Sequence, residues 1–122
     1  MPNGYCGRIL RVDLTNRRIE IEEPNDAFYR RYLGGIGFVT YYLLKEMKPG
    51  ADALSPENVF VFAAGPVTGA PIGGSGRSGV GAKSPLGGAL GTSEGGGFLG
   101  AELKRAGFDA IVVKGKADKP VY

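Results

Sequence analysis

The 122-residue sequence contains no histidine, no tryptophan and a single cysteine, Cys6. One cysteine without histidine cannot form a zinc site or hold an iron–sulfur cluster. Any catalytic metal must therefore be held by a non-protein ligand or by residues outside these 122. The same shortage excludes Ser-His and Cys-His catalytic pairs. A lone thiol cannot form an internal disulfide, so we expect a location in the reducing cytoplasm.

Long apolar runs and long basic runs are also absent. No stretch approaches the ~18 apolar residues of a membrane span, and no apolar segment typical of a signal peptide follows Met1. The net charge is only +3, which suits a small anionic ligand as well as it suits nucleic acid. Because no basic stripe is interleaved with exposed aromatic residues, we expect neither nucleic acid nor a membrane as a partner.

Glycine, in contrast, is abundant, with 22 residues. These glycines lack the strict three-residue period of collagen and occur in clusters, which is typical of backbone that approaches a ligand or another segment closely. Hydrophobic residues make up 43% of the chain, enough for one compact core. We therefore expect residues 1–122 to form a single domain.

Local patterning predicts an α+β fold with mixed or antiparallel sheets and a few helices. Alternating residues near the N-terminus predict a hairpin that places Leu10, Val12 and Leu14 on one face. The expected strands are 7–14, 18–22, 59–64, 79–83, 88–92 and 109–114, and the expected helices are 26–33, 37–47 and 98–106. This order is not a regular βαβ series. A further strand would begin at 120–122, where the sequence stops, so we interpret the chain as part of a longer protein.

The segment 73–79 places Arg77 among residues that have almost no side chains. Arginine can donate two parallel hydrogen bonds to a phosphate, and glycine lets a ligand approach the backbone. Lys83, six residues later, could add a point charge. The alternative is a glycine-rich surface turn with a solvated arginine, and composition alone leaves both readings open.

A second glycine run, Gly95-Gly96-Gly97, directly precedes the helix expected from Phe98. Such a run exposes backbone N–H groups at the positive end of a helix dipole, which favours an anion. It matches neither the P-loop nor the dinucleotide-binding glycine pattern, and an ordinary flexible helix entry is the alternative. Two anion sites in one domain would suit a ligand with two phosphates. A third run, 34–37, is more typical of a connector between helices.

Carboxylates provide no further candidate site. Glu94, Glu102 and Asp109 belong to different expected elements, without the spacing of a catalytic pair. We expect Glu102 and Asp109 to be solvated or to cap helices.

Ten collinear segments resemble the aldehyde:ferredoxin oxidoreductase family, and together they span nearly the whole chain. They are 7–15 (GRILRVDLT), 32–35 (YLGG), 43–46 (LLKE), 54–58 (LSPEN), 64–69 (AGPVTG), 83–86 (KSPL), 96–104 (GGFLGAELK), 106–113 (AGFDAIVV), 115–117 (GKA) and 119–122 (KPVY). The length and the order of these matches make the resemblance specific to this family.

The resemblance implies an enzyme that oxidises aldehydes to carboxylic acids with water as the oxygen source. Electrons would pass from tungsten, less commonly molybdenum, through a 4Fe-4S cluster to ferredoxin. In the family, dithiolenes of two molybdopterins hold the metal, and Mg²⁺ bridges their phosphates. This chain would be about half of the N-terminal domain that cradles the cofactor. The remaining domains would supply the cluster cysteines and the acid/base residues, and a homodimer is a possible assembly.

Carried over residue by residue, the resemblance assigns cofactor binding to Arg77, which matches the family's phosphate-pairing arginine. The backbone of 94–97 and the charge of Lys83 complete the expected cofactor-binding set. Glu94 replaces a family asparagine whose backbone carbonyl binds magnesium, so only a backbone role carries over. Ile36 replaces a common arginine, and that contact is not expected. The alternative function is a stand-alone, non-catalytic module that binds a phosphate ligand or a partner.

Overall fold

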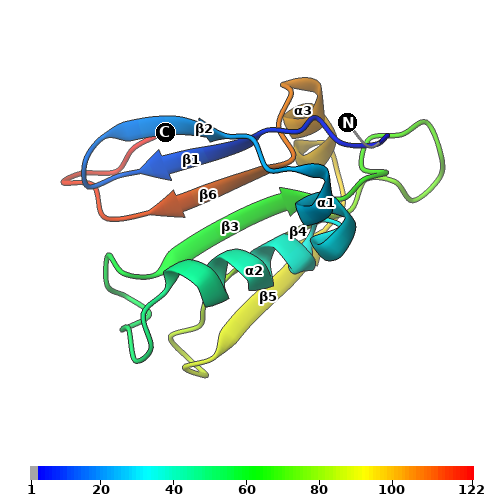
Figure 1. Ribbon diagram of the computed structural model, residues 1–122. Helices are drawn as coiled ribbons and strands as arrows, with labels where there is room; N and C mark the ends of the chain where they lie inside the picture. The colour runs from blue at the N-terminus through cyan, green and yellow to red at the C-terminus, as the bar shows by residue number, and fades with distance from the viewer. Residues whose placement is uncertain (1–2) are drawn as a thin grey trace.

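The computed structural model describes residues 3–122 as one six-stranded sheet with helices on both of its faces (Figure 1). The elements in chain order are β1 (Ile9–Asp13), β2 (Arg18–Glu22), α1 (Asp26–Tyr32), α2 (Ile36–Glu46), β3 (Val59–Ala64), β4 (Ser78–Lys83), β5 (Leu90–Gly95), α3 (Leu99–Arg105) and β6 (Ala110–Lys114). Within residues 3–122, no helix combines the length and the apolar character that crossing a membrane requires.

The sheet is mixed, with the strand order β2-β1-β6-β3-β4-β5. β1 and β6 are parallel, whereas the other four pairs are antiparallel. The parallel pair joins the first and the last strand, so the N-terminal hairpin becomes part of the same sheet as β3, β4 and β5. The predicted α+β class with a mixed sheet is confirmed.

The main core lies between α2 and one face of the sheet. The side chains of Phe38, Val39 and Tyr42 are fully buried there, because positions three and four residues apart lie on one side of a helix. They pack against inward-facing strand residues such as Ile9, Val61, Ala63 and Val112. A Cβ atom at Gly81 of β4 would overlap the Val39 side chain, so glycine lets α2 approach the sheet closely.

α1 begins and ends with local signals that are visible in the sequence. The Asn25 side chain accepts a hydrogen bond of 3.0 Å from the backbone N–H of Phe28, which is the usual N-cap arrangement. Leu33 ends the helix with φ +61°, and glycines follow it. The predicted helix is therefore confirmed, and of the two residues that could cap it, Asn25 and Asp26, the cap is Asn25.

One predicted strand is corrected by the structure, and the face that Leu10 and Val12 share, as predicted, lies away from the main core. Residues 120–122 form no strand. On β1, Ile9 is the side chain that is fully buried against the core, whereas Leu10 and Val12 are only half-buried on the opposite face. The difference arises because α2 covers the Ile9 face, where Arg11 also meets the end of α2 at Glu46.

Candidate functional site

Four glycine-rich segments meet at one end of the sheet, where β3 ends, β4 begins and β5 ends. The segments are 34–37, 65–69, 73–79 and 95–97, and we call this region the glycine end. The N–H of Gly35 donates to the carbonyl of Ala64 at 3.0 Å. A Cβ atom at Gly79 would lie 3.2 Å from the backbone nitrogen of Ile36. The run 34–37 is therefore more than a connector between helices, because it packs against the backbone of two strands.

Arg77 and the run Gly95–Gly97 are neighbours at the glycine end. Ser78 pairs with Gly95 in the β4–β5 ladder, which sets the residue before Ser78 beside the residue after Gly95. A Cβ atom at Gly76 would lie only 3.3 Å from the carbonyl oxygen of Gly97. The two predicted anion-binding segments, which lie about 20 positions apart in sequence, are thus brought together by strand pairing.

The Arg77 side chain is exposed. No carboxylate among residues 3–122 forms an ion pair with its guanidinium. The surface around it consists of backbone with few side chains. Gly95, Gly96 and Gly97, which lie beside it, are exposed as well. This chain therefore presents the arginine on an open surface rather than in a closed pocket.

A buried threonine holds the backbone of Arg77 in place. The Thr68 side chain, 6% exposed, donates a hydrogen bond of 2.6 Å to the carbonyl of Arg77 and accepts one of 2.8 Å from the N–H of Gly65. Further along the same loop, the N–H of Gly69 donates to the carbonyl of Ser75 at 3.0 Å. These bonds close the segment 65–77 onto itself, so that the guanidinium projects from a fixed loop.

α3 packs directly on that loop. A Cβ atom at Gly100 would lie 2.9 Å from the Thr68 methyl group and 3.0 Å from the Ser78 Cβ atom. The sequence did not predict this contact between Thr68 and Arg77, although Thr68 lies within the AGPVTG segment. A buried polar contact of this kind leaves no periodic signal in the sequence.

Lys83 lies apart from Arg77, at the opposite end of β4. Six residues of extended strand span roughly 20 Å. The Lys83 ammonium donates to the carbonyl of Ala51, and its backbone N–H donates to the Asn58 side chain at 3.0 Å. The structure therefore does not bring the predicted Lys83 charge to the glycine end.

Glu94 and the N-terminus of α3 also differ from what the sequence predicts. The Glu94 side chain is exposed on β5, opposite Gly79. The expected helix 98–106 is shorter in the structure, because α3 has only seven residues and its N-cap residue, Phe98, makes no capping bond through its side chain. A helix of two turns sums few peptide dipoles. The contribution that the sequence predicts from the α3 dipole is therefore small.

Asp109 is buried rather than solvated, which corrects the prediction made for it. Its side chain is 1% exposed, and it accepts hydrogen bonds from the N–H groups of Cys6 at 3.0 Å and Gly7 at 2.7 Å. The Lys104 ammonium lies 2.9 Å from the same carboxylate. Burial, and then the Asp109 charge, raise the pKa of the Cys6 thiol. The cluster fixes the N-terminal segment to the start of β6 and keeps the thiol protonated.

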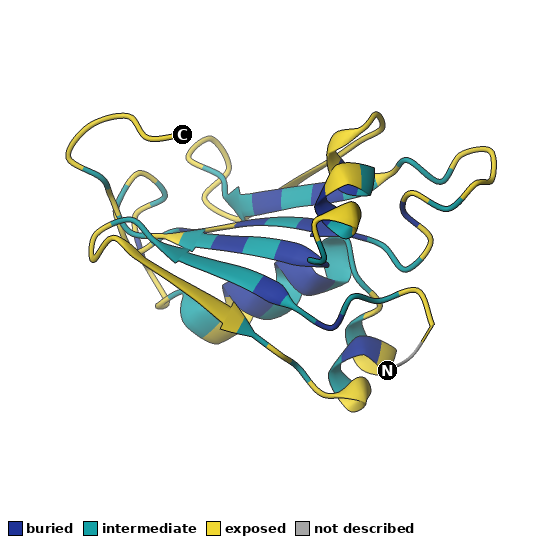
Figure 2. Cartoon of the chain, turned by 90° about the horizontal axis from the view of Figure 1, so that it is seen from above, coloured by how far each residue is buried: buried dark blue, intermediate teal, exposed yellow. Residues whose placement is uncertain are grey.

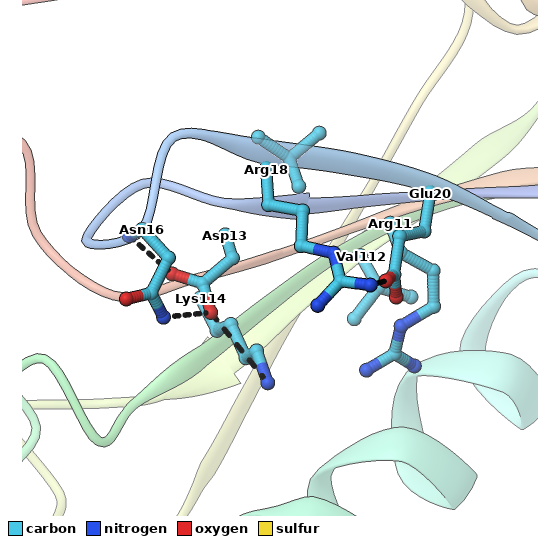
Figure 3. Close-up of a pocket in the computed structure, with 8 residues that line it drawn as sticks. Arg11, Asp13, Asn16, Arg18, Glu20, Val112 and Lys114 are labelled. Carbon is cyan, nitrogen blue, oxygen red and sulfur yellow. Dashed lines mark hydrogen bonds and ion pairs between the residues drawn. The ribbon is translucent and has the colours of Figure 1, made fainter.

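The cavity in Figure 3 lies at the other end of the sheet, beside the β1–β2 hairpin. Its volume is about 160 Å³. Its charged lining residues are all paired, Arg11 with Glu22 and Glu46 outside the lining and the others with one another. Asp13 accepts from the N–H of Asn16 at 3.0 Å and lies 3.9 Å from the Lys114 ammonium. Arg18 and Glu20 form a second pair at 2.6 Å. Because these charges neutralise one another, we do not assign a ligand to this cavity.

Comparisons with known proteins agree with the fold. Residues 9–122 match the family described as aldehyde ferredoxin oxidoreductase, N-terminal domain. The chain belongs to this family. It is 52% identical over 119 residues to a tungsten-containing aldehyde ferredoxin oxidoreductase of Pyrococcus abyssi, and the match covers 98% of this chain and 20% of the relative. A protein of the same description from Pyrococcus furiosus is 50% identical with the same coverage.

Other relatives are described with different activities. An aliphatic sulfonate oxidoreductase, WOR-like subunit, of Pyrococcus furiosus is 36% identical over 122 residues, which are 98% of this chain and 19% of that protein. A chain in the solved active site complex BamBC of benzoyl coenzyme A reductase with 1,5-dienoyl-CoA is 38% identical, with a TM-score of 0.95, over 100% of this chain and 19% of that chain. This chain thus spans about a fifth of the relatives that it matches, and the shared domain accompanies several substrates.

Proposed function

We propose that this chain is the part of a tungsten-dependent aldehyde:ferredoxin oxidoreductase that binds the phosphate ends of a bis-molybdopterin cofactor. The observation that carries the proposal is the exposed Arg77 guanidinium, which has no ion-pair partner among residues 3–122 and is fixed by Thr68 beside the bare backbone of Gly95–Gly97. An unpaired arginine on a rigid, glycine-lined surface fits a phosphate group. The relatives described as tungsten-containing support the choice of cofactor.

The role of each group follows from its chemistry. The planar guanidinium of Arg77 can donate two parallel hydrogen bonds to phosphate oxygens, which positions the cofactor as well as binding it. Glycine at 95–97 allows phosphate oxygens to approach backbone N–H groups without meeting a side chain. Following the family resemblance, we assign the backbone carbonyl of Glu94, which lies next to this run near the end of β5, as a group that would hold a Mg²⁺ ion. Hard oxygen atoms are the ligands that Mg²⁺ prefers.

The cofactor, when bound, would supply the two-electron oxidation of an aldehyde to a carboxylic acid. The residues of this chain would bind and orient it, and other parts of the enzyme would carry the 4Fe-4S cluster, the acid/base residues and the surface that ferredoxin contacts.

The test is Arg77→Ala in the full-length protein, with tungsten measured by mass spectrometry and pterin by the fluorescence of its oxidation product. Loss of hydrogen bonds to a charged group costs about 1.5–3 kcal/mol, roughly a 10- to 150-fold loss of affinity. We expect both contents to fall together. Arg105→Ala is the matched control, because Arg105 is an exposed arginine that pairs with Glu102 on α3, and its variant should load fully. Full loading of Arg77→Ala would contradict the proposal.

A further inference from the structure

Two rows of apolar side chains cross the sheet on the face opposite α2. The β ladders align Ile19, Val12, Val113 and Phe60 in one row across four strands, and Ile21, Leu10, Ile111, Phe62 and Val80 in the next row. We call these two rows the open face. Ile19 is 70% exposed, Ile21 52% and Phe60 47%. A sheet face that is exposed to water carries mostly polar residues, whereas a contiguous apolar surface marks an interface.

The described residues cover only part of the open face. α3 lies on this side of the sheet at the glycine end, where Gly100 is packed beside Ser78. Figure 2, seen from above, shows α3 and α2 on opposite sides of the strands. Away from α3, the rows continue across β1 and β2 with no helix above them. The half of the sheet that carries the N-terminal hairpin is therefore the half that lacks a cover.

The last residues of the chain run beside this uncovered half. Val121 and Tyr122 line an apolar cavity of about 680 Å³ together with Val12, Ile19 and Val113. Figure 1 shows the C-terminus next to β1 and β2. Val121 and Tyr122 are themselves exposed, so this segment leaves apolar surface of its own. Polypeptide that continues from Tyr122 would start directly at the open face.

We propose that the open face is the docking surface for the polypeptide that follows this domain in the oxidoreductase. The domain is N-terminal in its family, and it makes up 20% of the length of a relative with 52% identity. Sequence that follows Tyr122 is tethered to the edge of the face and so has a high effective concentration there. The proposal rests on the proposed function only in taking this chain as part of the longer enzyme. This following polypeptide would contribute an apolar surface that packs against the two rows.

Two variants that each add one cysteine at neighbouring positions of β2 test this docking. Ile19→Cys places a thiol on the open face, whereas Glu20→Cys places one on the other face of the same strand, where Glu20 is 51% exposed. Both are made in the full-length protein with Cys6→Ser. Because the rest of the enzyme would keep its cluster cysteines, the maleimide labelling rate at position 19 or 20 is measured by mass spectrometry of the peptide that contains it, in native and in unfolding conditions. We expect labelling at position 19 to be slowed at least ~100-fold by folding and labelling at position 20 less than ~10-fold, because only the former requires an opening event.

Equal labelling at the two positions in the native full-length protein would overturn the proposal. Protection at position 19 that disappears when the protein is diluted to monomers would assign the open face to a second copy and would also overturn it. Tungsten content of the two variants is a separate readout. A protected open face with an unaltered cofactor content in Arg77→Ala would refute the cofactor role alone, so the two failures are distinguishable.

Discussion

Replacing the buried carboxylate of Asp109 should destabilise the fold by removing the attachment of the N-terminal segment. In Asp109→Asn, an amide nitrogen takes the position of one carboxylate oxygen. If it replaces Oδ2, the N–H of Gly7 loses its 2.7 Å acceptor, whereas Oδ1 still accepts from Cys6 at 3.0 Å and from Lys104 at 2.9 Å. One buried donor without an acceptor costs about 1–3 kcal/mol. Lys104 in addition loses its charged partner while only 13% of its side chain is exposed.

Breaking a buried ion pair by removing one partner costs roughly 3–5 kcal/mol. We therefore expect about 3–5 kcal/mol for Asp109→Ala and, because the amide keeps one acceptor, roughly 2–3 kcal/mol for Asp109→Asn. These losses are a large part of the total for a small domain, which is typically ~5–15 kcal/mol. Asp109→Asn is therefore the variant to measure if Asp109→Ala does not fold.

The assay is urea unfolding of the 122-residue chain, with the free energy of unfolding extrapolated to water. Asp118→Asn is the matched control, because Asp118 is 87% exposed and makes one surface pair with Arg17. Exposed pairs contribute only about 0–1 kcal/mol. A loss below ~1 kcal/mol for Asp109→Asn, or one equal to that of the control, would refute the assignment of the buried cluster as the attachment of the N-terminal segment.

Three further predictions follow from contacts elsewhere in the domain. Thr68→Val removes both hydrogen bonds of the Thr68 hydroxyl, so we expect a loss of about 1–3 kcal/mol and faster amide exchange at Gly65. Gly81→Ala places a methyl group against Val39 and should cost roughly 1–3 kcal/mol, whereas Gly87→Ala, with nothing within 4 Å, should change the free energy of unfolding by less than ~0.5 kcal/mol. Burial raises the pKa of Tyr29 and of Tyr42. Because the folded-state values lie above the unfolded value of about 10, stability should be constant below that pH and fall above it. Two of the six tyrosines should then ionise, by absorbance at 295 nm, only on unfolding.

Most of the fold was predictable because its elements carry local signals. Alternation identified the hairpin of β1 and β2, the Asn25 cap identified α1, and the apolar run identified β3. The face of β1 that enters the core was not predictable in this way. Leu10 and Val12 form the more apolar face, yet α2 packs on the face of Ile9. That choice depends on where a helix from a distant part of the chain crosses the sheet.

The candidate site was predictable in its parts but not in its assembly. Arg77 and the glycine run at 95–97 were distinguished by composition, and only the β4–β5 pairing shows that they are neighbours. Lys83 was included because it is close in sequence, but an extended strand carries it to the other end of the sheet. Asp109 was assigned to the surface because buried carboxylates are rare without partners. Its partners, the N–H groups of Cys6 and Gly7, come from the opposite end of the chain.

A structure of the full-length enzyme loaded with its cofactor is the most direct measurement of what the glycine end binds. Our account places a phosphate oxygen at about 2.7–2.9 Å from the guanidinium nitrogens of Arg77, with a second contact to the backbone between 94 and 97. Density that shows the Arg77 side chain in solvent, with the phosphates held by residues outside these 122, would contradict the account.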